Sequence, residues 1–228
     1  DLHSFPTRRS SDLHIVVKLL LEAKSRQAEE IRSYPRDESE GRPRMPVSWA
    51  QQRLWFIDQL EGGSAAYHVA VALRLKGVLD EGALRNALDA IVQRHEMLRT
   101  VFVSEAHGPK QEIGAEAHFA LVTTDLSTAE QSWRTASLQQ QQFEELHRPF
   151  ALAAGPLIRG RLLRMHPAEH VLLITMHHIA ADGWSIGVLL DELKQLYRAY
   201  CEGRGNELAP LQVQYYMEIG RASCRERV

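Results

Sequence analysis

Apolar and polar positions follow a strand period over several parts of the chain. In residues 67–76 the apolar side chains of Val69, Val71, Leu73 and Leu75 alternate with other residues, which predicts a strand with one face in a core. Residues 157–165 and 170–177 are two further predicted strands, and the turn-forming residues 166–169 between them predict an antiparallel hairpin. Shorter strands are predicted at residues 99–103, 111–113 and 119–123.

Helical spacing of apolar residues separates these strands. A helix is predicted to begin after Ser48 and to end at the glycines of residues 62–63, because serine can cap a first turn and glycine readily ends a helix. Its expected buried face consists of Leu54, Trp55, Ile57 and Leu60. Further helices are predicted from Asp80 to about residue 95, over residues 127–147 and over residues 185–200. This mixed order of helices and antiparallel strands predicts an α+β fold.

The two ends of the chain differ from its centre. Residues 14–45 predict a short helix followed by a linker rich in Pro, Arg and Glu, and residues 46–216 are expected to form the folded domain. Residues 1–13 and 217–228 show neither a helical nor a strand period and are similar to translated vector sequence. Both end segments are therefore expected to be non-native.

Composition and charge exclude several classes of function. The 27 Lys and Arg residues nearly balance the 29 Asp and Glu residues, and the formal net charge of -2 predicts no basic surface for nucleic acid. The two cysteines, Cys201 and Cys224, predict neither a disulfide framework nor a thiolate metal site, which favours a reducing, cytoplasmic compartment. The longest apolar run, residues 13–21, is about half as long as a bilayer-spanning helix, so no membrane partner is expected.

The candidate chemistry lies in residues 171–185. A predicted apolar strand runs into His177 and His178, which are followed by Asp182, Gly183 and the predicted last helix. Polar side chains at a strand end beside a tight turn are often presented to a cleft by a rigid scaffold. Because adjacent strand residues point to opposite faces, the two histidines are not expected to share a metal ion, and one of them is expected to face the cleft.

A Ser-His-Asp triad that uses Ser185 is an alternative interpretation of the same segment. No nucleophile elbow of the G-x-S-x-G type is expected here. A serine that begins a helix is more typical of an N-cap, which is the role we expect for Ser185.

Three stretches of the sequence resemble one known family. Residues 177–183 match the H-H-x-x-x-D-G motif of the condensation domains of nonribosomal peptide synthetases, which is similar to the active-site motif of chloramphenicol acetyltransferase. Residues 48–60 resemble the first condensation-domain motif, residues 94–102 resemble the second, and residues 209–215 resemble the approach to a fourth. The resemblance covers residues 46–216, about half of a two-lobed domain. It implies a chloramphenicol acetyltransferase-like two-layer α/β sandwich of which this chain is the truncated N-terminal lobe.

The resemblance also implies an activity. Family members join an upstream acyl or peptidyl thioester to the amino group of a downstream aminoacyl thioester, and both substrates are carried on phosphopantetheine arms. No directly bound cofactor or metal is then expected, and the expected partners are two carrier domains, an adenylation domain and the missing C-terminal lobe. Residues 182–185 and 50–55 resemble the class that joins an L-configured donor to an L-configured acceptor.

Residue roles carry over by position. The second histidine, His178, is expected to accept a proton from the attacking amine or to hold that amine, and His177 is expected to be a structural residue of the inner face. Asp182 is expected to pair with Arg99, or less favourably with Arg94, because a buried carboxylate needs a partner. Gly183 is expected to allow close approach of the backbone and to offer its N–H to an oxyanion. Packing roles are expected for Trp49, Trp55, Trp184 and His95.

Two other functions stay open on sequence alone. An isolated lobe could be inactive, serving only to dock a carrier domain and exposing apolar surface that the second lobe would cover. Another acyltransferase with the same histidine motif could form esters, but such a protein is not expected to contain the stretch at residues 48–60.

Overall fold

The computed structural model describes residues 44–211 and residue 214. The predictions for residues 1–13, for the helix and most of the linker in residues 14–45, and for residues 217–228 concern segments outside this range. Within the described residues, every helix is too short or too polar to cross a lipid bilayer.

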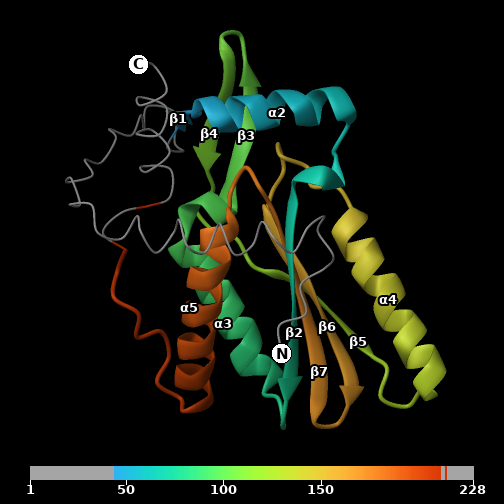
Figure 1. Ribbon diagram of the computed structural model, residues 1–228. Coiled ribbons are helices and arrows are strands. Elements are labelled where there is room, and N and C mark those ends of the chain that lie inside the picture. The colour runs from blue at the N-terminus through green and yellow to red at the C-terminus, as the bar shows by residue number, and fades with distance from the viewer. Residues whose placement is uncertain (1–43, 212–213, 215–228) are drawn as a thin grey trace, which may run out of the picture.

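A four-stranded sheet forms the centre of the structure (Figure 1). Its strand order is β2 (His68–Lys76), β7 (Glu169–His177), β6 (Ile158–His166) and β5 (Ala120–Asp125). Strands β6 and β7 form the predicted antiparallel hairpin, β2 pairs antiparallel with β7, and β5 runs parallel to β6. The strand period in the sequence therefore predicted these four strands correctly.

Two helices cover one face of this sheet (Figure 1). α3 (Glu81–Arg94) is capped by Asp80, and α5 (Gly183–Cys201) packs beside α3. Their apolar stripes meet the alternate sheet residues that point toward them, and burial of this surface is the main stabilising term of the fold. The core of this face includes Leu84, Leu88, Ile91, Ile158, Leu162, Leu172, Ile174, Leu189 and Leu193.

The opposite face of the sheet is covered by α4 (Gln131–His147). Leu138 of α4 packs against a cluster that contains Leu163 and Leu173. Near the C-terminal end of α4, buried Glu145 pairs with buried Arg159 of β6 at 2.6 Å. The helix was predicted from its own spacing, but the face that it covers is set by tertiary packing.

A second, three-stranded sheet lies at one end of the large sheet (Figure 1). Its order is β1 (Arg44–Pro46), β4 (Gly108–Ile113) and β3 (Thr100–Glu105), and α2 (Trp49–Glu61) lies beside it. Ser48 and Gly62 cap α2 as predicted. The predicted buried face of α2 is wrong at Leu60, which is 71% exposed, because Gln51 and Asp58 take the buried positions. Strand β1 was not predicted, since two of its three residues fall in the expected linker.

Two short helical turns complete the fold: η1 (Ala65–Tyr67) precedes β2, and η2 (Glu96–Arg99) precedes β3.

We expect Gly160 of β6 to be required for the packing of the large sheet. A Cβ atom at this position would lie against the Leu173 carbonyl oxygen and 3.1 Å from the Phe119 ring. Gly160→Ala is therefore expected to lower the free energy of unfolding by about 1–3 kcal/mol. Gly187 of α5 is the matched control, because a Cβ atom there meets nothing within 4 Å. Gly187→Ala is expected to raise the same quantity by about 0.5–1 kcal/mol. Urea unfolding measures both changes, and equal midpoints for the two variants would contradict the packing argument.

Candidate functional site

The candidate site is the turn that joins β7 to α5. His177 is the last residue of β7, and Gly183 is the first residue of α5. The backbone N–H of His177 donates to the Leu157 carbonyl at 3.1 Å, and the N–H of His178 donates to the Tyr67 carbonyl at 2.8 Å. The turn is thus hydrogen-bonded to the start of β6 and to the start of β2.

Burial separates His178 from its neighbours. His177 and Ile179 are each 1% exposed and Ala180 is 4% exposed, whereas the side chain of His178 is exposed. Ile179 and Ala180 belong to the core between α2 and the small sheet, together with Met97. The imidazole of His178 is therefore held at the surface by a backbone that is buried on both sides of it.

The ring of His177 lies on the α4 side of the sheet, among other aromatic rings. It makes edge contacts with His68 and Phe150, at centroid distances of 6.0 and 6.1 Å. Its Nδ1 atom accepts a hydrogen bond from the Ile179 N–H at 3.1 Å, so this nitrogen carries no proton. Burial, followed by the nearby charges of His68 and His178, lowers the pKa of His177 to about 4. His177 is therefore a neutral, inward-facing residue at neutral pH.

His68 is a neighbour of the site that the sequence analysis did not identify. It pairs with His177 in the β2–β7 register, and its Nδ1 atom lies 2.6 Å from the Leu146 carbonyl oxygen of α4. Burial lowers the pKa of His68. Phe150 packs edge-on against His68 at 5.0 Å, and the Arg159 guanidinium stacks 3.8 Å from the centre of the Phe150 ring. Only the strand register places His68 here, and no local sequence signal indicates it.

Asp182 caps α5. Its Oδ1 atom accepts hydrogen bonds from the Ser185 N–H at 2.9 Å and from the Ser185 hydroxyl at 2.8 Å. The Ser185 hydroxyl oxygen accepts in turn from the Asp182 N–H at 3.2 Å, which completes a reciprocal capping box. The prediction that Ser185 is the N-cap of α5 is therefore wrong. Asp182 is the N-cap, and Ser185 lies three residues later, in the first turn of the helix.

The predicted pair between Asp182 and Arg99 is also wrong. Arg99 donates to the Gly114 carbonyl and lies 3.7 Å from Glu96, and Arg94 pairs with Glu192 at 2.9 Å. Across residues 44–211 and 214, no ion pair joins Asp182 to either arginine. A partly buried carboxylate at a helix N-terminus is stabilised by the backbone N–H groups there, so it needs no arginine.

Ser185 is not arranged as a nucleophile. Residues 183–187 read Gly-Trp-Ser-Ile-Gly and match the G-x-S-x-G pattern, contrary to the expectation above. However, Ser185 lies within the first turn of α5, and its hydroxyl is bonded to Asp182 rather than to a histidine. The capping interactions therefore account for this serine.

Gly183 faces open space, and two of the three tryptophans differ from their predicted environments. A Cβ atom at Gly183 would meet no atom within 4 Å, so the backbone of the described chain does not itself require glycine there. Trp184 is 50% exposed and Trp49 is 56% exposed, so neither is the core residue that was predicted. Trp55 is partly buried against the core beside α2, as predicted.

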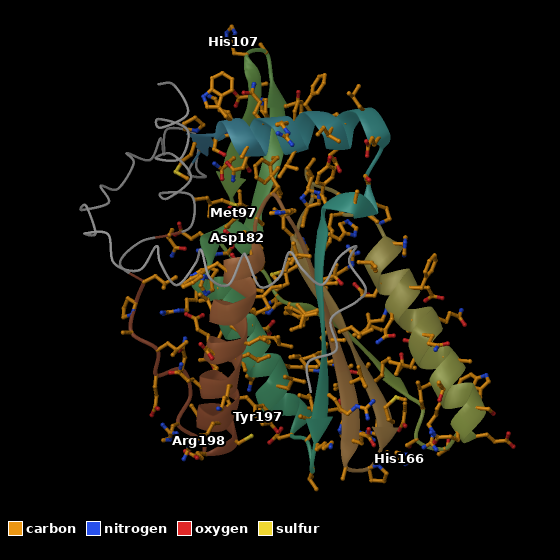
Figure 2. The ribbon with its side chains drawn as sticks, viewed as in Figure 1. Met97, His107, His166, Asp182, Tyr197 and Arg198 are labelled. Carbon is orange, nitrogen blue, oxygen red and sulfur yellow. The ribbon has the colours of Figure 1, made fainter. Side chains whose placement is uncertain are left out.

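A cavity of about 210 Å³ lies beside the turn. Its lining includes Met97, Asp182, Trp184 and His95, and Figure 2 shows Met97 and Asp182 next to each other at the N-terminal end of α5. The Nε2 atom of His95 lies 2.6 Å from a carboxylate oxygen of Glu192. Burial opposes ionisation of Glu192, but the hydrogen bonds and charges of His95 and Arg94 hold its pKa below the usual value. The cavity thus has mostly apolar walls, with His95, Asp182 and Ser185 among its polar lining residues.

No group of three or more His, Cys, Asp or Glu side chains in the described part of the chain is arranged to hold a metal ion. His177 and His178 differ in burial, one inside the fold and one at its surface. The arrangement can therefore present a single imidazole to a reacting group, next to the N-terminus of a helix.

Comparisons with known proteins point to one family. The profile described as "Condensation domain" matches residues 42–222. Chondramide synthase cmdD of Chondromyces crocatus is 44% identical over 171 residues, which is 75% of this chain and 4% of that synthase. Malpinin synthetase of Mortierella alpina is 43% identical over 177 residues, which is 75% of this chain and 2% of that synthetase.

Solved structures share the fold. The X-domain from teicoplanin biosynthesis has a TM-score of 0.71 and 32% identity, over 87% of this chain and 42% of that chain. The starter condensation domain of the rhizomide synthetase RzmA has the same TM-score of 0.71 at 24% identity, over 81% of this chain and 44% of that chain. The chain thus spans less than half of either domain, and the predicted chloramphenicol acetyltransferase-like α+β fold is confirmed.

We expect protonation of His177 at acid pH to lower the free energy of unfolding. Its pKa is about 4 in the folded chain and about 6.5 when unfolded, so the unfolded state binds the proton more tightly. The neutral, buried His177 therefore contributes about 3 kcal/mol to the free energy of unfolding. This contribution is fully present above pH 6.5 and is lost as the pH falls toward 4. Urea unfolding between pH 4 and 7 measures it.

His177→Asn keeps a hydrogen-bond acceptor but does not titrate, so its free energy of unfolding is expected to fall less steeply over this range. His107→Ala, at the exposed tip of the β3–β4 hairpin (Figure 2), is expected to keep the original slope. Parallel curves for the His177 variant and the original chain would contradict the assignment.

We expect Asp182 to act as a cap rather than as half of an ion pair. Asp182→Ala removes the acceptor for the Ser185 N–H and is expected to lower the free energy of unfolding by about 1 kcal/mol. Asp182→Asn keeps an oxygen in the same place and is expected to cost less than about 0.5 kcal/mol. If urea unfolding gives the two variants the same loss, the negative charge is required and the capping account fails.

Proposed function

Because this chain belongs to the condensation-domain family of nonribosomal peptide synthetases, we propose that it supplies the histidine-bearing half of an active site that forms amide bonds. In this proposal the donor is an acyl or peptidyl thioester and the acceptor is the amino group of an aminoacyl thioester. Both are carried on phosphopantetheine arms of carrier domains. One observation carries the proposal: within the H-H-x-x-x-D-G motif of residues 177–183, His178 is exposed while the residues on both sides of it are buried.

His178 is the residue that we assign to the attacking amine. An α-amino group has a pKa near 8 and is largely protonated at pH 7, so it must lose a proton before or during attack. A neutral imidazole can accept that proton or hold the amine by a hydrogen bond. Because both reactants are tethered, much of the rate enhancement comes from proximity, and an acid–base contribution of about 10² to 10⁴ is sufficient.

The residues around His178 have supporting roles in this proposal. His177 anchors the turn through its Nδ1 atom, and Asp182 fixes where α5 begins. Gly183 stands at the first position of α5, where backbone N–H groups lack intrahelical acceptors. We assign its N–H to the oxyanion of the tetrahedral intermediate, with the open space above this glycine available to the substrate. Arg99 supports the neighbouring η2 through the Gly114 carbonyl.

The partners and the subtype are part of the same proposal. Two carrier domains and an adenylation domain would supply the loaded substrates, and the other lobe of the condensation domain would complete the cleft. Residues 46–216 would form one lobe of that domain, without a cofactor of its own, inside the cytoplasm. The continuation of the motif at residues 182–185, with residues 50–55, favours an L-configured donor and an L-configured acceptor.

The test is product formation in the intact synthetase that carries this segment. With both neighbouring carrier domains loaded by the synthetase's own adenylation domains, His178→Ala is expected to lower the single-turnover rate of amide formation by about 10² to 10⁴. Mass spectrometry of the carrier-bound product measures this rate. His107→Ala, a histidine variant at an exposed hairpin tip, is the matched control and is expected to keep the original rate. An unchanged rate for His178→Ala would overturn the proposal.

A further inference from the structure

Gln51 is a buried polar side chain in α2 that the function described above does not use. It is 2% exposed. Its Oε1 atom accepts a hydrogen bond from the Ser48 N–H at 3.0 Å, as part of the capping box of α2. Because this oxygen must accept from an N–H group, the other end of the amide is the NH₂ donor.

The amide donor of Gln51 points toward the turn that carries His178. Its Nε2 atom lies 3.4 Å from the carbonyl oxygen of Ile179, the residue that follows His178. The same nitrogen lies 3.4 Å from the Gln111 Oε1 atom and 3.8 Å from the Met97 Sδ atom. A single side chain therefore links α2, the small sheet and the turn inside one buried cluster.

Gln51 cannot turn away easily, because its own neighbours are fixed. Gln111 is also 2% exposed, and its Nε2 atom donates to the Pro46 carbonyl at 2.9 Å. This bond leaves the Gln111 Oε1 atom free to accept from Gln51. A buried polar group that loses its partner costs free energy, so the connected amides favour one arrangement.

Gln51 contacts a backbone acceptor of the turn, whereas the other hydrogen bonds of the turn use its backbone donors. Inside the turn, the Ile179 N–H donates to the His177 ring and the Ala180 N–H donates to the His177 carbonyl. The N–H groups of His177 and His178 donate to residues outside the turn, namely to the carbonyls of Leu157 and Tyr67. The bonds to Leu157 and Tyr67 hold the turn to the residues that precede β6 and β2. Gln51 holds it from the opposite direction through the acceptor at Ile179, on the side of the small sheet.

We propose that Gln51 is a positioning residue for the condensation reaction, acting on His178 through the Ile179 carbonyl. This inference rests on the proposed function. Displacement of a catalytic group by about 1 Å can cost about 10² in rate. Loss of the Gln51 donor is therefore expected to lower kcat, whereas the apparent affinity for the loaded acceptor carrier, which binds outside this buried cluster, stays close to its original value.

The test compares four variants of the intact synthetase, with its carrier domains loaded as above. Gln51→Met fills the same space without the donor and is expected to lower kcat about 10- to 100-fold, with KM for the acceptor carrier changed by less than about threefold. Gln51→Leu also removes the donor and buries no charge, so it is expected to show the same loss. It serves as the second variant should Gln51→Met fail to fold.

Two controls separate positioning from simple stability. Ser48→Ala removes the cap of α2 but leaves the Gln51 amide, so it is expected to lower the thermal unfolding midpoint while keeping kcat. Gln52→Met changes the exposed neighbour of Gln51 and is expected to change neither quantity. A loss of kcat in Ser48→Ala equal to that in Gln51→Met would overturn the inference, because the cap alone would then explain it.

The failure of this inference is distinguishable from failure of the proposed function. An active synthetase that is slowed by His178→Ala but not by either Gln51 variant contradicts only the role of Gln51. A synthetase whose rate of amide formation is unchanged by His178→Ala contradicts the proposed function, whatever the Gln51 variants show.

Discussion

The site depends on one constraint: the backbone of residues 177–180 is buried and hydrogen-bonded to separate elements, while the side chain between them is exposed. His177 faces the α4 side of the large sheet, and Ile179 faces the core beside α2. His178 is therefore presented by the scaffold rather than by contacts of its own ring, which leaves the imidazole free to meet a reacting group.

The two cores of the structure meet at this turn. The large sheet with α3, α4 and α5 forms one body, and the small sheet with α2 contributes a separate buried cluster that includes Ile179 and Ala180. The three sequence motifs are distant in the chain, yet the first lies on α2, the second includes η2, and the third is the turn itself. Packing of the small sheet against the large one is what brings the three motifs together.

Much of the fold was predictable because local signals and tertiary packing agree. Several features depend only on residues that are close in the sequence. These are the alternation in residues 67–76, the hairpin turn at residues 166–169, and the helix caps Ser48 and Asp80. The exceptions need information from distant elements. Leu60 is exposed because α2 turns its polar residues inward, and His68 reaches the site only through the β2–β7 register.

The strand end and helix start around His178 were predicted, but the hydrogen bonds between the residues of this turn were not. The motif placed His178 correctly at a strand end beside a helix start, since that order is visible in the sequence. The pairing of Asp182 with Arg99 was wrong, because a carboxylate three residues before a serine can cap the helix locally and needs no distant cation. The hydrogen bond from the Gln51 side-chain amide to the Ile179 carbonyl joins residues 128 positions apart. No sequence spacing indicates such a contact.

The pairing of β2 with β7 also limits how this protein can change in length. Tyr67 and His68 lie opposite the end of β7, so a single residue gained or lost there would turn every side chain of β2 to the other face. At the far end of the same ladder Lys76 lies opposite Glu169, and the turn of residues 166–169 there joins β6 to β7 away from the candidate site. An inserted residue is therefore expected to be tolerated in the turn of residues 166–169 and to disrupt the sheet at residues 67–68.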